Sequence, residues 1–162
     1  MGKIILKARN IYKSYDNGEK TLSVLHDLSI KVEKNQIITI TGQSGSGKST
    51  LLNILGSIDN PDSGEVEIDG LNILNLNNYE IAKIRNQKIG FVFQFHHLLS
   101  EFTALENVLM PVWIGSSKSG KKEEAIDLFA ELNLSSKMNY YPNQLSGGER
   151  SRVALIRGII NK

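Results

Sequence analysis

Residues 42–50, Gly-Gln-Ser-Gly-Ser-Gly-Lys-Ser-Thr, have the residue types and spacing that most clearly predict chemistry. They match the phosphate-binding pattern G-x-x-x-x-G-K-[ST], in which glycines let backbone N–H groups curl closely around an anion. Lys48 would contact the outer phosphates of a nucleotide, and the hydroxyl of Ser49 would ligate Mg²⁺. We therefore expect the nucleotide-binding positions to be Gly42, Gln43, Ser44, Gly45, Ser46, Gly47, Lys48, Ser49 and Thr50.

The residues on either side of this loop support the interpretation. Residues 36–41 are almost uniformly apolar or β-branched, which predicts a strand buried on both faces. Residues 48–58 predict a helix, whose positive N-terminal end would point at the bound anion. The alternative is a glycine-rich turn before an ordinary helix, because the pattern alone has false positives.

Length and composition are those of one soluble globular domain, with 162 residues of which 40% are apolar and 22% are charged. The net charge of +2 is too small to predict a nucleic-acid partner. No stretch approaches the roughly 20 consecutive apolar residues of a transmembrane helix, so we expect any membrane role to depend on a partner. The N-terminal apolar run is too short for a signal peptide, and the absence of cysteine excludes disulfide bonds and thiolate chemistry.

The predicted order of elements starts with antiparallel strands and continues with βα units, which indicates an α/β fold with a β-rich edge. We expect strands at residues 3–8, 22–32, 36–41, 65–70 and 89–93. We expect helices at residues 48–58, 75–86 with Ile81 and Ile84 inward, 103–110 halted by Pro111, 121–132 and 146–160. The helix at 121–132 would bury one face, formed by Ala125, Leu128, Phe129 and Leu132. Connections are predicted as a turn at 15–18, a loop at 60–64 and a flexible link at 116–120.

A second motif, Leu-Ser-Gly-Gly-Glu at residues 145–149, begins the last predicted helix. Ser146 and Glu149 have the spacing of a capping box, so a purely structural interpretation is complete in itself. Two glycines nevertheless weaken a first helical turn. They are understandable if a phosphate must approach the bare N–H groups of that turn.

Together the two motifs resemble the ATPase subunit of ABC transporters. Residues 42–50 match its Walker A loop, and residues 145–149 match its signature motif with Glu149 where glutamine is usual. The resemblance extends over essentially the whole chain. It implies one P-loop NTPase domain of the ABC ATPase type, with a core at 1–93 that includes an N-terminal antiparallel β subdomain, and a Q-loop and helical subdomain at 94–162. It also implies ATP and Mg²⁺ as cofactors.

The resemblance assigns roles to further residues. Tyr15 falls where the family has an aromatic side chain that stacks on adenine, although a turn aromatic packed on the sheet explains it equally well. Gln94 matches the Q-loop glutamine, which would reach Mg²⁺ or the attacking water; otherwise it is a polar residue in a turn. The signature would act in trans on the nucleotide of a second, head-to-tail ATPase subunit through Leu145, Ser146, Gly147, Gly148 and Glu149.

Residues 91–99 and 102–108 are similar to the branch of the family that contains the lipoprotein-releasing (Lol) ATPases, the macrolide-exporter ATPases and the cell-division ATPase FtsE, with the Lol ATPases the most similar. This resemblance implies ATP-driven release of lipoproteins from the inner membrane toward the outer membrane, at the cytoplasmic face of the inner membrane. Residues 95–113 would contact membrane permease subunits, with His97 and Glu101 at the polar rim. A macrolide-exporter or FtsE-like ATPase is the alternative within this branch, and a nucleotide kinase or GTPase would leave residues 145–149 unexplained.

The sequence also departs from the family pattern. Arg150 and Ser151 stand where two glutamines are usual, whereas Arg152 and Arg157 keep the pattern. The Walker B aspartate, the catalytic glutamate and the switch histidine of the family follow the signature helix and do not occur within residues 1–162. We therefore expect these 162 residues to bind nucleotide without turnover, as a truncated subunit or a nonproductive fragment would. The histidines are expected to be strand or loop residues, not metal ligands, at His26, His96 and His97.

Overall fold

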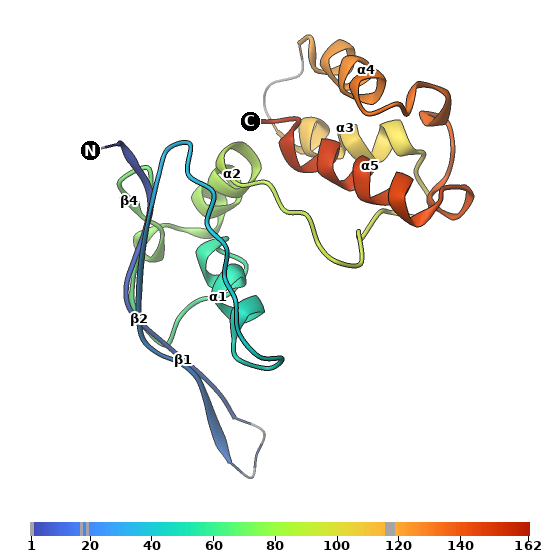
Figure 1. The fold of residues 1–162 in the computed structure, drawn as a ribbon. Coiled ribbons are helices and arrows are strands. Elements are labelled where there is room, and N and C mark those ends of the chain that lie inside the picture. Colours follow the sequence, from blue (N-terminus) through green and yellow to red (C-terminus); the bar gives the residue numbers. More distant parts are fainter. Residues whose placement is uncertain (1, 17, 19, 116–118) are drawn as a thin grey trace. The chain divides into compact units, whose positions relative to one another are not determined.

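The computed structural model describes residues 2–16, 18, 20–115 and 119–162. The chain divides into two units, Met1–Ile81 and Ala82–Lys162, and each is described by itself (Figure 1). The first unit is built on a β-sheet and the second on helices. Of the helices in the described ranges, none is long and apolar enough to cross a membrane.

The first unit contains a four-stranded antiparallel sheet with the order β2-β1-β3-β4. Its strands are β1 (Ile4–Asp16), β2 (Thr21–Glu33), β3 (Ser63–Ile68) and β4 (Leu71–Asn72). The predicted strands 3–8, 22–32 and 65–70 are thereby confirmed as elements, but β1 continues to Asp16 because its second half also pairs with β2. The predicted turn at 15–18 includes Asn17, which lies outside the described residues.

Helix α1 (Lys48–Leu55) packs on this sheet and completes the apolar core of the first unit. It begins as predicted but ends at Leu55, because Ser57 takes a left-handed φ of 57° and the N–H of Ile58 bonds back to the Asn53 carbonyl at 2.8 Å. The buried apolar side chains of this unit are Ala8, Ile11, Leu25, Leu51, Ile54, Leu55, Val66, Ile68 and Ile73.

Two further helices follow, the short η1 (Ile73–Asn75) and α2 (Asn78–Lys88). The predicted start of the helix at residue 75 is wrong, because Asn77 caps it: Asn77 Oδ1 accepts from Glu80 N at 3.0 Å and Glu80 Oε2 accepts from Asn77 N at 2.9 Å. Ile81 and Ile84 are only half-buried. Helix α2 therefore lacks the buried face that the sequence predicted.

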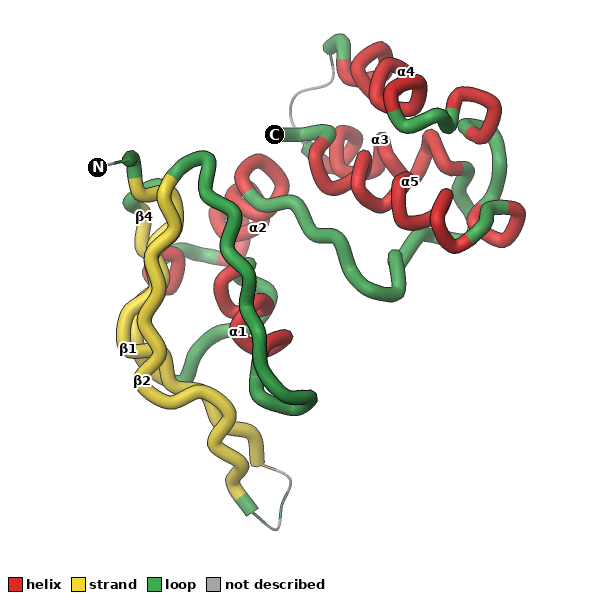
Figure 2. The backbone as a smooth tube through the Cα atoms, viewed as in Figure 1, coloured by secondary structure: helices red, strands yellow, loops and turns green. Residues whose placement is uncertain are grey.

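The predicted buried strands at 36–41 and 89–93 are not formed. Both segments are loops, and the first is part of the green stretch between β2 and α1 in Figure 2. Ile37 is 97% exposed. β-Branched residues favour an extended backbone, but a strand also needs a neighbouring strand to bond its N–H and C=O groups. Within the described ranges no strand pairs with either segment.

The second unit is a cluster of three helices, α3 (Ala104–Ile114), α4 (Lys121–Glu131) and α5 (Gly147–Ile159), with the short helices η2 (Ser135–Lys137) and η3 (Pro142–Gln144) between the last two. Its core is apolar and buried at Ala104, Val108, Leu109, Val112, Ala125, Phe129, Leu134, Leu145, Val153, Ile156 and Ile160. The predicted inward face of α4 is confirmed, since Leu128 and Leu132 also pack against this core. Residues 116–118 of the predicted link lie outside the described residues.

Pro111 does not halt α3, contrary to the sequence prediction. The proline is inside the helix, and Val112 beyond it is buried in the helical core. Proline removes one backbone donor from a helix, but burial of the following apolar turn favours continuation. The helix ends at Gly115, whose N–H bonds to the Pro111 carbonyl at 3.0 Å.

Candidate nucleotide-binding site

The phosphate loop owes its shape to glycines with φ angles that other residues adopt rarely. Gly42, Gly45 and Gly47 have φ angles of 156°, 79° and 86°. Around Gly45, the N–H of Ser46 bonds to the Gln43 carbonyl at 3.2 Å and closes a turn. A loop of this kind turns its backbone N–H groups toward one side, which suits an anion.

Gly47 joins the loop to α1 and lies directly against strand β2. A Cβ at Gly47 would lie 2.9 Å from Val24 Cγ1 and 3.1 Å from Leu25 Cδ2, so a side chain would push the loop off the strand. Gly47 is also the N-cap of α1, and it offers no side chain to bond the N–H groups of the first turn. Those donors and the helix dipole are the groups that bind phosphate at helix N-termini.

Lys48 folds back over the loop. Its Nζ donates to the carbonyls of Gly42 at 3.0 Å and Gln43 at 2.5 Å, and lies 3.4 Å from Ser46 Oγ. The ammonium group is thereby held at the opening of the glycine loop, where it adds a positive charge to the backbone donors. The residues present therefore fit the phosphates of a nucleotide.

The donor set for Mg²⁺ is small. Ser49 follows Lys48 and is exposed, and its hydroxyl would supply one ligand, with phosphate oxygens and water as the natural remaining ligands. Among the residues that the structure describes, no three His, Cys, Asp or Glu side chains form a group that could hold a metal by itself. A magnesium ion here would thus come with the nucleotide.

Tyr15, the predicted adenine platform, lies on β1 in the same unit as the phosphate loop. Tyr15 is 43% exposed, and its hydroxyl donates to Asp59 Oδ2 at 2.9 Å. The ammonium of Lys13 lies 5.3 Å from the centre of the ring. Sequence reasoning missed Asp59 and Lys13, because neither belongs to a motif and the contact to Asp59 joins distant segments.

The signature motif forms the predicted capping box at the start of α5. Ser146 Oγ accepts from Glu149 N at 3.3 Å, and Glu149 Oε2 accepts from Ser146 N at 2.7 Å. This donation by Ser146 holds the pKa of the Glu149 carboxyl below its usual value, and the charges of Lys137 and Arg152 act in the same direction. Leu145 is buried in the helical core, so its packing role is structural.

The two signature glycines are exposed at the first turn of α5. A Cβ at Gly147 would meet no atom within 4 Å, and one at Gly148 would meet only Arg152 Nη1 at 3.7 Å. Among the residues that the structure describes, no close contact therefore requires glycine at either position. What the glycines provide is open access to backbone N–H groups.

Gln94 is exposed in the turn after residues 89–93 of the second unit. The residues after it are fixed to α5, since Arg157 donates from Nη2 to the His96 carbonyl at 2.7 Å and from Nη1 to the His97 carbonyl at 2.6 Å. His96 Nε2 and Ser151 Oγ also form a hydrogen bond of 2.7 Å. Burial lowers the pKa of Arg157. The signature helix and the Q-loop segment are thus connected by direct bonds that the sequence did not reveal.

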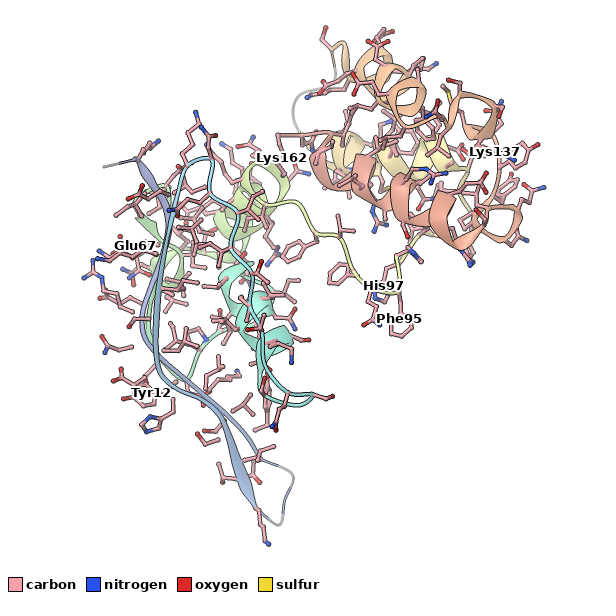
Figure 3. All side chains as sticks on the ribbon, viewed as in Figure 1. Tyr12, Glu67, Phe95, His97, Lys137 and Lys162 are labelled. Atoms are coloured by element: carbon pink, nitrogen blue, oxygen red, sulfur yellow. The ribbon has the colours of Figure 1, made fainter. Side chains whose placement is uncertain are left out.

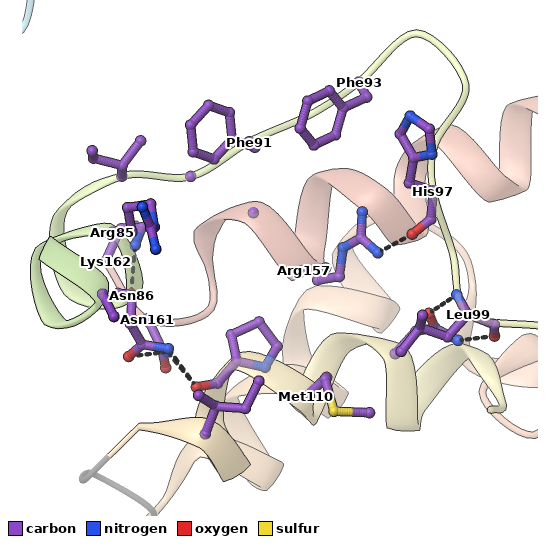
Figure 4. Close-up of a pocket in the computed structure, with 17 residues that line it drawn as sticks. Arg85, Asn86, Phe91, Phe93, His97, Leu99, Met110, Arg157, Asn161 and Lys162 are labelled. Carbon is purple, nitrogen blue, oxygen red and sulfur yellow. Dashed lines mark hydrogen bonds between the residues drawn. The ribbon is translucent and has the colours of Figure 1, made fainter. Parts of the chain in front are cut away.

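A hollow of about 500 Å³ lies between this segment and α3. Figure 4 shows His97, Leu99, Met110 and Arg157 around it, with the bond from Arg157 to the His97 carbonyl. At its other end, Asn86 and Asn161 both donate to the Pro111 carbonyl, at 2.8 and 3.0 Å. The structure thus groups Tyr15 with residues 42–50 in the first unit, and Gln94 with residues 145–149 in the second.

The sequence pattern described as ABC transporter matches residues 25–162. The chain belongs to the ABC transporter family. Among curated ABC transporter proteins, it is 46% identical over its whole length to the lipoprotein-releasing system ATP-binding protein LolD of Saccharophagus degradans and 47% identical over 98% of its length to LolD of Porphyromonas gingivalis. The chain spans 72% and 71% of the length of these two relatives. The predicted resemblance is confirmed.

Solved structures of ABC cassettes confirm the fold. The chain matches the dimeric structure of MJ0796, a bacterial ABC transporter cassette, with a TM-score of 0.89 and 39% identity over 97% of this chain and 70% of that one. A dimeric post-hydrolysis state of MJ0796 bound to ADP and phosphate matches with a TM-score of 0.88 and 38% identity, again over 97% of this chain and 70% of that one. The predicted ABC ATPase fold class is therefore correct for this chain.

Proposed function

We propose that this chain is the ATP-binding subunit of an ABC transporter that releases lipoproteins from the inner membrane toward the outer membrane. The observation that carries the proposal is the phosphate loop, in which Lys48 and the N-terminus of α1 converge on one glycine-lined opening. The proposal that the transported substrate is a lipoprotein is based on the lipoprotein-releasing relatives, which are 45–47% identical to the chain. The subunit acts at the cytoplasmic face of the inner membrane, bound to permease subunits.

Within the site, the loop N–H groups and Lys48 bind the phosphates, and Tyr15 stacks on the adenine ring. We propose Ser49 and Gln94 as the residues that would hold Mg²⁺, and the ion would neutralise negative charge on the phosphates. In a head-to-tail homodimer, the open first turn of α5 meets the phosphates bound by the partner subunit, through Gly147 and Gly148. The dimeric MJ0796 cassettes support such an arrangement.

We assign no general base within residues 1–162, so these residues are expected to bind ATP without hydrolysing it at the rate of the family. In the first unit, the carboxylate of Asp59 is engaged by Lys13 and Tyr15. In the second unit, Glu149 is engaged by Ser146 in the capping box. Neither carboxylate is available to orient water.

The permease partner is proposed to contact residues 95–113. Phe95, which Figure 3 labels on the segment after Gln94, is 78% exposed, and Leu99 and Trp113 are also exposed. His97 and Leu99 line the hollow of Figure 4, which we propose receives part of an amphipathic helix of the partner. Glu101 would lie at the polar rim.

Calorimetric titration with ATP, with and without Mg²⁺, tests the proposal. Lys48→Ala removes a charge-assisted contact and should weaken ATP binding by roughly 10- to 150-fold, the equivalent of about 1.5–3 kcal/mol. The matched control is Lys34→Ala, which removes an exposed lysine of the same unit outside the loop and should bind ATP as the wild type does. Equal affinities of folded wild type and Lys48→Ala would refute the site.

A further inference from the structure

The hydroxyl of Tyr15 is hydrogen-bonded to a network of charged groups that no motif of the family predicts. Asp59 accepts from Tyr15 Oη at 2.9 Å through Oδ2, and from Lys13 Nζ at 3.1 Å and Asn60 N at 2.8 Å through Oδ1. Both carboxylate oxygens are thus occupied. Burial alone would raise the pKa of Asp59, but the bonds from Lys13 and Tyr15 hold it below its usual value, so the carboxylate is ionised at neutral pH.

Asp59 is itself held by the helix of the phosphate loop. The N–H groups of Ile58 and Asp59 both bond to the carbonyl of Asn53, at 2.8 and 3.2 Å, in the last turns of α1. Helix α1 therefore carries the phosphate-binding residues at its start and the partner of Tyr15 just past its end. A rigid helix between these two points fixes the distance between the phosphate loop and the ring.

Lys13 completes the network on the strand. Its Nζ also donates to the Asn60 carbonyl at 2.6 Å and lies 3.7 Å from Asp62 Oδ1, and its side chain is only 12% exposed. In the register of β1 and β2, Lys13 is opposite Leu25, whose Cδ2 would lie 3.1 Å from a Cβ at Gly47. The network and the phosphate loop are thus attached to the same part of the sheet.

We infer that Asp59 is a positioning residue for adenine: through the hydroxyl of Tyr15 and with Lys13 beside the ring, it fixes the aromatic platform at the distance from the phosphate loop that an adenine nucleotide spans. The inference rests on the proposed function, in which Tyr15 stacks on the base. A tyrosine that is fixed before binding loses less conformational freedom when the base arrives. Because Tyr15 is an exposed residue, an unanchored ring would have to be ordered by the nucleotide itself.

The test compares the affinities for ATP and for inorganic tripolyphosphate, which has phosphates but no base. Tyr15→Phe and Asp59→Ala each break the bond between the two side chains, and Tyr15→Phe does so while keeping the ring. Each should weaken ATP binding by about 2- to 10-fold and leave tripolyphosphate binding unchanged. The double variant should bind ATP no more weakly than whichever single variant has the lower ATP affinity. The reason is that each change breaks the same hydrogen bond, the one between Tyr15 and Asp59.

Lys48→Ala in the same experiment separates the two proposals. If Lys48→Ala weakens both ligands while Tyr15→Phe and Asp59→Ala bind ATP as the wild type does, the anchoring role is refuted and the phosphate site stands. Equal losses for ATP and tripolyphosphate in Asp59→Ala also refute the inference, because Asp59 would then act on the loop. If Lys48→Ala changes neither affinity, the proposed function fails, and the inference fails with it.

Discussion

The carboxamide of Asn107 bonds to both backbone polar groups of Leu99. Asn107 Oδ1 accepts from Leu99 N at 2.7 Å, and Asn107 Nδ2 donates to the Leu99 carbonyl at 3.0 Å. The same Nδ2 donates to the carbonyls of Phe102 at 2.9 Å and Thr103 at 3.0 Å. Asn107 is completely buried, so this one side chain fixes the segment after the Q-loop to the first turns of α3.

Replacing Asn107 by alanine should therefore destabilise the second unit. The change removes the side-chain acceptor of the Leu99 N–H and the side-chain donor of the Phe102 carbonyl, and a buried unsatisfied group costs about 1–3 kcal/mol. Urea denaturation would measure the loss of unfolding free energy. Asn143→Ala is the matched control, since Asn143 is exposed in the same unit and its loss should change stability by less than about 0.5 kcal/mol. Equal stabilities of the two variants would contradict the role of Asn107.

The capping box at the signature should make stability depend on pH. Because the bond from Ser146 lowers the pKa of Glu149 in the folded chain, its contribution is complete above the pKa of an unfolded glutamate and is lost as the pH falls through the lower, folded value. Glu149→Gln removes the titrating group, so its unfolding free energy should fall less steeply below about pH 4.5 than that of the wild type. Glu131→Gln, an exposed change at the end of α4, serves as the control. Parallel pH profiles for wild type and Glu149→Gln would disprove this effect.

The polypeptide of residues 1–162 is expected to show no appreciable ATP turnover. Loss of a general base costs typically 10²–10⁴-fold in rate, and none is assigned in these residues. A phosphate-release assay on folded protein, with Lys48→Ala as the control for contaminating ATPase, measures this directly. Steady release that Lys48→Ala abolishes would show that a base exists within residues 1–162.

The proposed permease surface can be mapped with single cysteines, because the chain has none of its own. Cysteines at positions 97–106 should cross-link to the permease subunits in the assembled transporter. Cysteines at 65–69, in and just after β3, should not. The assignment of residues 95–113 is wrong if both sets cross-link equally or if neither does.

The sequence predicted the features that depend on neighbouring residues. The glycine loop before α1, the capping box of Ser146 and Glu149, and the apolar face of α4 follow from local residue types, and the structure contains each of them. The nucleotide contacts proposed for Tyr15 and Gln94 stay predictions.

The errors concern features that depend on distant residues. Residues 36–41 and 89–93 have strand-forming composition, but a strand is defined by a pairing partner that composition does not reveal. Pro111 was expected to end α3, yet the helix continues past it because Val112 is buried in the helical core. The bond between Tyr15 and Asp59 joins residues 44 positions apart, and no spacing rule predicts it.

Hydrogen exchange at the phosphate loop tests the central claim most directly, because the loop is proposed to bind phosphate with its backbone N–H groups. With Mg²⁺ and ATP, the amides of residues 42–50 should exchange more slowly than in the free protein. Adenosine, which has no phosphates, should not protect them, and Lys48→Ala should need a correspondingly higher ATP concentration for the same protection. If ATP leaves exchange at 42–50 unchanged while it protects another segment, the nucleotide binds elsewhere and the account is contradicted.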